Sequence, residues 1–298
     1  SPAYVTTDES GKITNISDQH SAVVNEEING FAIAPVTNAH SHAFQYGMAG
    51  LTENIPQGQD HDNFWSWRDR MYRLADQITP DQMESIAKML YAEMLRVGYN
   101  HVVEFHYLRN DEKGNNYSNP NEMADRLISA ALKVGIKITL VPVYYRCSDF
   151  GKNPSEAQRR FQFSSTDSYF KHIESLSSTY ASNSEVTIGY GLHSIRTAKA
   201  KEIKEIISYN TELPCHLHIS EQMREVDACV KYLGARPVEW LTNETEVGSN
   251  CHLVHSTHIT DDEMNAIIRA DANVVICPST EGNLGDGFFP ISDYIKAS

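Results

Sequence analysis

Residues 37–45 read Thr37-Asn38-Ala39-His40-Ser41-His42-Ala43-Phe44-Gln45 and follow an apolar run at residues 31–36. In an extended strand, residues two apart point to the same side. His40 and His42 would therefore direct two imidazoles at one point, where they could bind a zinc ion. The alternative interpretation is a polar loop with two surface histidines. This motif alone does not decide between the two interpretations, and the evidence has to come from the rest of the chain.

The composition is that of a globular protein with one large domain or two smaller ones. The chain has 298 residues, of which 41% are hydrophobic and 21% are charged. No apolar run approaches the length of a membrane span, and Ser1-Pro2-Ala3-Tyr4 does not begin a basic-then-apolar signal peptide. We therefore expect a cytoplasmic protein without a membrane partner.

The charge balance bears on the partners of the protein. The formal net charge is −14, which argues against a nucleic-acid partner, because nucleic-acid binding needs a basic face. An anionic substrate would therefore need arginines of its own within the binding site.

The cysteines predict no disulfide framework. There are five of them, an odd number, and no Cys-x-x-Cys pair occurs. They are Cys147, Cys215, Cys229, Cys251 and Cys277. Three of the five lie in or beside apolar strand-like runs, so buried free thiols in a reducing cytoplasm are the simplest interpretation.

Three segments flank the first strand and the first helix. Residues 1–33 are polar with weak alternation, which predicts strands of a small appended β domain or a partly ordered arm. Residues 50–64 are rich in Gly, Asn, Gln and Asp and predict a loop. Residues 64–73 are dense in aromatics and arginine. They form either a short amphipathic helix that covers the core or a lid that brings cationic groups to an acidic ligand.

The remainder of the chain alternates between strand and helix patterns. Thr79-Pro80-Asp81-Gln82 has the features of a helix start, with Thr as N-cap, and Gly98 ends that helix. Further helices are predicted at residues 121–134, 198–209, from 237 and at 261–269. Strands are predicted at residues 101–107, 136–143, 186–190, 215–219, 251–254 and 274–277.

This alternation predicts an α/β fold with a parallel sheet covered by helices. With the His-x-His strand as the first, we count seven strands, whereas a (β/α)8 TIM-type barrel needs one more. A doubly wound sheet is the alternative. Barrels carry their catalytic residues at the C-terminal ends of the strands, and the unusual residues of this chain fall at such positions.

Histidines, acidic residues and other polar side chains follow most of the predicted strands. They are His40 and His42, then Glu104, His106 and Tyr107, then His193 and Arg196, then His216, His218 and Glu221, then His252, His255 and His258, and finally Glu281. A zinc site in a barrel explains the histidines economically. His40, His42 and one of the pair His216 and His218 would bind the metal and leave an open position for water.

Together these motifs resemble a known family. They read Asn-x-His-Ser-His-Ala-Phe-Gln, Phe-Trp-x-Trp-Arg, Glu-Phe-His-Tyr, His-Ser-x-Arg, His-x-His-x-x-Glu-Gln and Leu-Val-His-x-Thr-His. The pattern resembles the amidohydrolase superfamily and, within it, the deiminases that act on N-formimino-L-glutamate. The resemblance extends from about residue 35 to residue 290, and the second, third and fourth motifs are the most specific for these deiminases.

The resemblance implies a metal centre and two catalytic groups. His40, His42 and His218 match the zinc ligands, Glu221 matches the proton shuttle, and His255 matches the histidine that polarises the group under attack. No lysine ends the fourth predicted strand, so the resemblance favours one ion, zinc or another divalent metal, over a two-metal centre.

The resemblance also implies the residues that hold the substrate. They are Gln45, Arg68, Tyr107, His193 and Arg196. Two arginines suit a dicarboxylate, because each guanidinium can bind a carboxylate in bidentate fashion. Without the resemblance, surface salt bridges would be the preferred interpretation of both arginines. His216 is expected to be a core or supporting histidine, and His101, His106, His252 and His258 are expected to be structural.

The implied reaction is zinc-assisted hydrolysis of N-formimino-L-glutamate to N-formyl-L-glutamate and ammonia in histidine degradation. Two alternatives stay open: a zinc deaminase of the same class that acts on a cyclic amidine or nucleobase, and a metal-free inactive relative. The resemblance further implies a homodimer, because enzymes of this type are often dimeric.

One departure from the family concerns the C-terminal end. The family has a zinc-binding aspartate at the end of the eighth strand, and the sequence stops at Ser298, before that strand. We therefore expect a small N-terminal β segment at residues 1–33 and a C-terminally incomplete barrel at residues 34–298. Asp286 is a conceivable substitute for the aspartate, but it belongs to a loop that the family also has.

Overall fold

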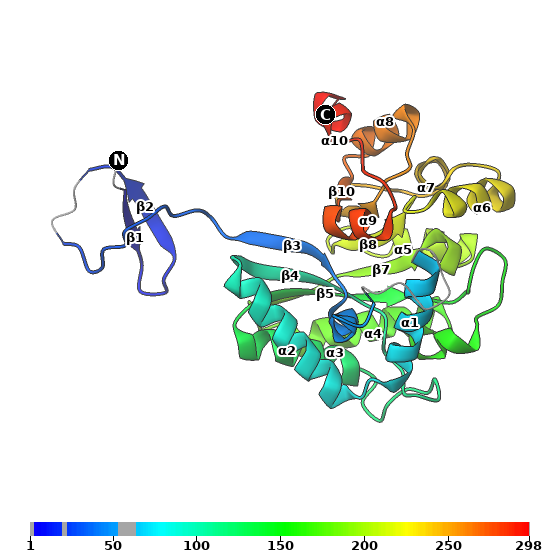
Figure 1. Ribbon diagram of the computed structural model, residues 1–298, viewed down its shortest axis with the longest axis horizontal. Helices are drawn as coiled ribbons and strands as arrows, with labels where there is room; N and C mark the ends of the chain where they lie inside the picture. The colour runs from blue at the N-terminus through cyan, green and yellow to red at the C-terminus, as the bar shows by residue number, and fades with distance from the viewer. Residues whose placement is uncertain (1–2, 20–22, 53–63, 298) are drawn as a thin grey trace. The chain divides into compact units, whose positions relative to one another are not determined.

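The computed structural model describes residues 3–19, 23–52 and 64–297, and it divides into two compact units. The first, Ser1–Ala34, contains the antiparallel pair β1 (Tyr4–Thr7) and β2 (Ile13–Ser17) (Figure 1). Most of the loop predicted at residues 50–64 lies outside the described residues. None of the described helices is both long and apolar enough to cross a membrane.

The second unit, Pro35–Ser298, is built on a parallel sheet. Its strands are β3 (Val36–Ser41), β4 (Tyr99–His106), β5 (Lys137–Tyr144), β6 (Val186–Ile188), β7 (Tyr190–Ser194), β8 (Cys215–Ile219), β9 (Cys251–His255) and β10 (Asn273–Val275). Their spatial order is β10-β9-β8-β7-β5-β4-β3, with β6 also paired to β5. The strands thus follow one another in chain order, as in a barrel, whereas a doubly wound sheet reverses its order at a switch point.

The barrel-type fold predicted from the alternation is therefore confirmed. The segment predicted as the fourth strand consists of β6 and β7 in succession, so the seven predicted strands correspond to the eight observed segments. Among the described residues, β10 and β3 are the two unpaired ends of the sheet. The apolar run at residues 31–36 is not itself a strand. Phe31 and Ile33 are exposed, and β3 begins only at Val36.

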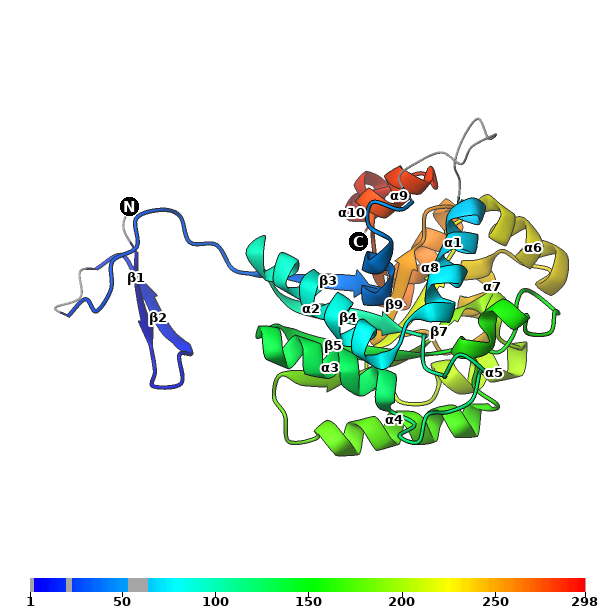
Figure 2. The same ribbon diagram turned by 60° about the horizontal axis from the view of Figure 1, so that its bottom comes forward.

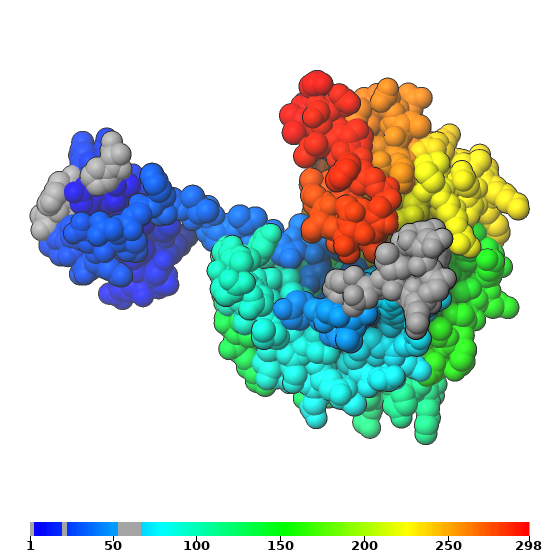
Figure 3. Space-filling model, viewed as in Figure 1, coloured from blue at the N-terminus to red at the C-terminus, as the bar shows by residue number. Residues whose placement is uncertain are grey.

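The described helices of the second unit lie around the sheet. They are α1 (Phe64–Gln77), α2 (Pro80–Arg96), α3 (Glu122–Val134), α4 (Thr166–Tyr180), α5 (Ala200–Ile207), α6 (Met223–Leu233), α7 (Pro237–Glu244), α8 (Asp261–Arg269), α9 (Pro278–Leu284) and α10 (Ile291–Ala297). Figure 2 shows α2, α3 and α4 along one outer side of β3, β4 and β5. In the space-filling view, the red atoms of α10 lie beside the orange atoms of α8, consistent with their contacts (Figure 3).

The predicted start of α2 is confirmed in detail. The Thr79 hydroxyl accepts a hydrogen bond from the Gln82 backbone N–H, and the Gln82 side chain accepts one from the Thr79 N–H. These reciprocal bonds satisfy two of the N–H groups that lack a partner at a helix N-terminus. Gly98, with φ of 96°, follows the helix and turns the chain into β4.

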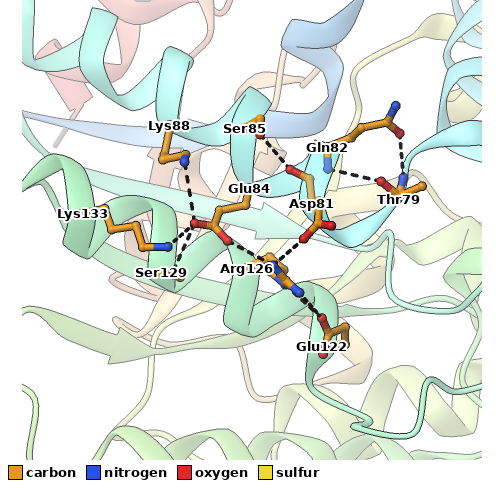
Figure 4. Close-up of polar contacts among 10 residues, drawn as sticks. All are labelled: Thr79, Asp81, Gln82, Glu84, Ser85, Lys88, Glu122, Arg126, Ser129 and Lys133. Carbon is orange, nitrogen blue, oxygen red and sulfur yellow. Dashed lines mark hydrogen bonds and ion pairs between the residues drawn. The ribbon is translucent and has the colours of Figure 1, made fainter.

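Ion pairs join α2 to α3 around one buried carboxylate (Figure 4). Glu84 of α2 is 7% exposed, and it pairs with Arg126 and Lys133 of α3 and with Lys88 of its own helix. The hydrogen bond from Lys133 lowers the pKa of Glu84, with Arg126 acting in the same direction, although burial alone would raise it. The network thus joins α2, which packs against β4, to α3, which packs against β5.

Gly191 is required where β7 approaches β8. A Cβ atom at this position would lie 2.0 Å from the backbone oxygen of His216, the residue that pairs with Gly191 in the sheet. Gly191→Ala is therefore expected to lower the free energy of unfolding by about 3 kcal/mol or more, as measured by chemical denaturation. The matched control is Gly282→Ala, where a Cβ meets nothing within 4 Å, and a loss equal to the control's would contradict the argument.

Candidate active site

Three imidazoles from two distant parts of the chain meet at one point. His40 lies on β3, His42 precedes the short 3-10 helix Ala43–Met48, and His218 lies on β8. Their Nε2 atoms form a triangle with sides of 2.9 Å (His40–His42), 3.0 Å (His40–His218) and 3.3 Å (His42–His218). The structure thus brings together all three residues predicted as metal ligands.

The donor set suits a divalent metal ion. Nδ1 of His42 lies 3.0 Å from the Phe105 carbonyl oxygen and Nδ1 of His218 lies 2.9 Å from that of His193. An N–H donated to each carbonyl leaves the Nε2 lone pair free to bind metal. Nitrogen ligands at about 2.0–2.1 Å from a tetrahedral zinc ion are about 3.3 Å apart. The sides of the observed triangle are close to that spacing. A bound cation would stabilise the three converging nitrogen lone pairs.

Burial keeps these imidazoles in the neutral form that metals bind. It lowers the pKa of His42 to about 4. It also lowers the pKa of His40 and that of His218 well below the ordinary value, and the neighbouring histidines act in the same direction. The site therefore needs little deprotonation before it can accept a metal ion at neutral pH.

His255 lies between two carboxylates. Its Nδ1 is 3.1 Å from Oε1 of Glu281 and its Nε2 is 3.5 Å from Oε1 of Glu221. Burial alone would lower the pKa of His255, but the two carboxylates raise it above the ordinary value. His255 has the left-handed backbone conformation (φ 73°), as does Ser220 before Glu221 (φ 52°). Such conformations are costly for residues other than glycine and are found preferentially at functional sites.

All ten residues predicted for the site line one pocket of about 100 Å³. They are His40, His42, Gln45, Arg68, Tyr107, His193, Arg196, His218, Glu221 and His255. The Gln45 side-chain amide donates to the Tyr107 hydroxyl over 2.9 Å. The pocket thus combines the imidazole triangle, the acid–histidine pair and two guanidinium groups.

Arg196 is partly buried and lies near the carboxylate of Glu225. The region predicted between strand and helix forms a short 3-10 helix, Ile195–Thr197, directly after β7. Burial opposes the charge of Arg196, yet the neighbouring Tyr145 and Glu225 raise its pKa above the ordinary value. Burial also raises the pKa of Glu225 to about 7. Arg196 lines the pocket and has no ion pair in the described part of the chain, so the surface salt bridge considered from sequence is not formed there.

Several pocket residues were not predicted. The aromatic and apolar part of the lining includes Trp67, Met71, Tyr72, Tyr145 and Phe161. Trp67, Met71 and Tyr72 belong to α1. Its aromatic and arginine-rich sequence predicted either a helix that covers the core or a lid over an acidic ligand. Tyr145 and Phe161 lie in a region for which the sequence offered no comparable pattern.

Glu281 is the most important residue that received no predicted role. Its Oε1 accepts a hydrogen bond from the Cys277 backbone N–H at 2.9 Å and faces His255. Within the described ranges, two groups have ligand atoms close enough to hold a metal ion: His40–His42–His218 and His255–Cys277–Glu281. The sequence placed Glu281 after the last predicted strand, but the structure forms helix α9 there and shows that the carboxylate turns back to His255.

The other histidines and Asp286 lie outside the triangle. His216 stacks on His252 of the adjacent strand with ring centroids 4.3 Å apart, and His101 contacts the Thr139 hydroxyl at 2.9 Å. Asp286 accepts a hydrogen bond from Gln222 and belongs to neither group of candidate metal ligands. The five cysteines are free, four of them buried, as predicted.

The fold and the site define a class of protein: the chain belongs to the amidohydrolase family, whose model matches residues 31–298. It is similar to the formimidoylglutamate deiminase of Pseudomonas aeruginosa, with 39% identity over 96% of this chain and 62% of the relative. The crystal structure of an amidohydrolase from Brucella melitensis has a TM-score of 0.91 at 38% identity, covering 99% of this chain and 65% of that one.

A more distant structure shows the fold alone. A zinc-bound adenosine deaminase from Xanthomonas campestris has a TM-score of 0.70 at 21% identity and covers 89% of this chain and 54% of that one. The chain therefore spans between 54% and 65% of the length of these relatives.

Proposed function

We propose that this protein hydrolyses N-formimino-L-glutamate to N-formyl-L-glutamate and ammonia. The observation that carries the proposal is one pocket in which the imidazole triangle lies with two arginines, Arg68 and Arg196. The similarity to the Pseudomonas deiminase supports the choice of substrate. We further propose that the protein acts in histidine degradation in the cytoplasm, as a homodimer without a nucleic-acid or membrane partner.

His40, His42 and His218 would hold one zinc ion or another divalent ion. When bound, the ion would acidify a water molecule and so supply a hydroxide at neutral pH. Two of the three side chains, His42 and His218, are already fixed by hydrogen bonds from Nδ1 to carbonyl oxygens, so they would hold the ion with little rearrangement.

The chain itself supplies the proton transfers. Glu221 would accept a proton from the attacking water and deliver it to the departing nitrogen, which leaves as ammonia. His255, held between Glu221 and Glu281, would stabilise charge that develops at the formimino group. Both side chains line the same pocket as the imidazole triangle, so these roles require no further assembly.

Arg68 and Arg196 would bind the two carboxylates of the substrate. Charge-assisted bonds to guanidinium groups are stronger than neutral ones, and a protein of net charge −14 needs local cations to bind a dianion. A deaminase for a neutral ring would have no use for two arginines. This is the reason to prefer a glutamyl substrate over a cyclic amidine or nucleobase.

Arg196→Gln is expected to lower kcat/KM for N-formimino-L-glutamate about 100-fold, mostly through KM, because a carboxylate loses its charged partner. Steady-state ammonia release measures the effect. Arg269→Gln, which removes an exposed arginine of α8, is the matched control. If Arg196→Gln left KM within about twofold of the parent value, the carboxylate assignment would be wrong.

Glu281→Gln is expected to lower kcat about 10-fold to 100-fold at nearly constant KM, because His255 loses a negative charge at Nδ1 that stabilises its protonated form. The zinc bound at the triangle should not change, since Glu281 belongs to the other group of candidate ligands. Kinetics and metal content are measured on the same preparation. An unchanged kcat would show that Glu281 supports only the backbone of α9.

The proposal as a whole is tested by ammonia release with zinc content measured in parallel. The substrates are N-formimino-L-glutamate, adenosine and cytosine. Turnover of the first alone supports the proposal. Turnover of a nucleobase or nucleoside favours the second kind of deaminase, and absence of bound metal after zinc is supplied to folded protein favours the inactive relative.

A further inference from the structure

A second pocket, of about 510 Å³, lies between the loop that follows β4 and helix α4. Its lining includes Arg109, Asn116, Asn121, Lys171 and His172, and it shares no described lining residue with the catalytic pocket. No role in the proposed reaction falls on these residues. What the pocket could bind must therefore be read from its own charges and hydrogen-bonding groups.

The pocket is cationic in an acidic protein. Arg109 and Lys171 line it, and none of the described lining residues is acidic. Neither cation has an ion pair with another described residue. The net charge of the chain is −14, so a pocket lined by two cations and, among the described residues, by no acidic one departs from the overall charge balance of the protein. A site of this kind favours an anionic occupant.

Arg109 is held rigidly by neutral groups. Its terminal nitrogens donate to Asn110 Oδ1 at 2.8 Å, to the Gln162 carbonyl oxygen at 3.0 Å and to Asn116 Oδ1 at 2.9 Å. The guanidinium also lies over the Phe163 ring, 3.9 Å from its centroid. These contacts fix the position of the charge without neutralising it, which lowers the cost of ordering the site when an anion binds.

Buried polar atoms at the pocket lack partners. His172 is 6% exposed and lines the pocket, yet within the described chain neither ring nitrogen has a hydrogen-bond partner. The same is true of Nε of Arg109 and Oδ1 of Asn121. Buried polar groups are nearly always hydrogen-bonded. Burial and the nearby Arg109 lower the pKa of His172 to about 3, so its neutral ring has one N–H to donate.

Two of the hydroxyl groups that line the pocket already donate within the protein. Ser164 donates to Ser168 Oγ at 3.1 Å, and Ser168 donates to the Ser165 carbonyl oxygen at 2.8 Å. Ser168 belongs to the first turn of the 15-residue helix α4, whose N-terminal end favours negative charge. We propose that this pocket binds a small organic anion through its phosphate or carboxylate group, with Arg109, Lys171 and His172 as the principal contacts.

The test is calorimetric titration of the 298-residue chain at low salt. The probes are glycerol 3-phosphate and succinate, with glycerol as the neutral control. Succinate could also enter the catalytic pocket, so every titration is repeated in Arg196→Gln. Binding of one or both anions, but not of glycerol, is expected in both proteins. Binding of one probe alone identifies the phosphate or the carboxylate as the recognised group.

Variants connect the binding to this pocket. Lys171 is exposed on α4, so Lys171→Gln should fold normally and weaken anion binding roughly fivefold, and Arg109→Gln should weaken it further. Lys231→Gln, which removes an exposed lysine of α6, should have no effect. Absence of binding up to about 10 mM, or binding that Lys171→Gln and Arg109→Gln leave unchanged, would overturn the proposal. None of these outcomes depends on the proposed deiminase activity.

Discussion

His218→Ala is expected to reduce the zinc content from about one ion per chain to near zero and to abolish ammonia release. The Nε2 of His218 lies 3.0 Å from that of His40 and 3.3 Å from that of His42, so its loss removes one of three ligands. Altering a group that merely supports a ligand costs about 10-fold to 100-fold in metal affinity, and removing a ligand should cost more. Elemental analysis of protein purified without chelator measures the effect.

His216→Ala is the matched control, because it makes the same change two residues earlier on the same strand. His216 is buried against His252 of β9 rather than at the triangle. Its replacement should lower stability through lost packing and leave the zinc content near one per chain in the folded fraction. Equal loss of zinc from both variants would mean that the effect is a general loss of structure and not of a ligand.

The histidine triangle was accessible from sequence because parallel strands obey a simple geometry. Strand periodicity places His40 and His42 on one side, and the C-terminal ends of the strands meet at one end of a barrel. Those two facts bring β3 and β8 together although about 180 residues separate them. The choice of His218 over His216 came from the resemblance, and the alternation of side chains along β8 gives its physical basis.

Groups that depend on local backbone detail were not predicted. Glu281 contacts His255 only because α9 begins at Pro278 and turns its first carboxylate inward, and a pattern that predicted a strand as far as Cys277 could not show this. The cationic pocket likewise depends on the loop after β4 folding against α4. Nothing in the sequence marks Arg109 and His172 as neighbours, since they are 63 positions apart and lie on different elements.

The division between β6 and β7 was also hidden from the sequence. The Tyr169 hydroxyl of α4 is 2.8 Å from the carbonyl oxygens of both Pro142 and Gly191, and it accepts a hydrogen bond from the Gly191 N–H at 2.7 Å. It thereby satisfies backbone groups where β5 changes its pairing from β6 to β7. A buried tyrosine in a helix pattern gives no sign of such a long-range role.

Glu221→Gln is expected to lower kcat for ammonia release about 1000-fold while leaving the zinc content unchanged. A positioned general acid–base contributes about 10²-fold to 10⁴-fold, and glutamine cannot transfer the proton. Glu221 is three residues after His218, its side chain is 13% exposed, and Oε1 lies 3.5 Å from Nε2 of His255. Glu221 is therefore beside the triangle without being one of its ligands. The substitution should therefore slow the reaction and leave the binding of zinc unchanged.

Asp227→Asn provides the surface control, because it neutralises an exposed carboxylate on the helix that follows Glu221. Steady-state kinetics, zinc analysis and thermal denaturation are compared for the parent and both variants. Nearly full activity of zinc-loaded Glu221→Gln would show that another group moves the proton. The candidates would then be His255 and Glu281, whose contact at 3.1 Å offers the other acid–base pair of the pocket.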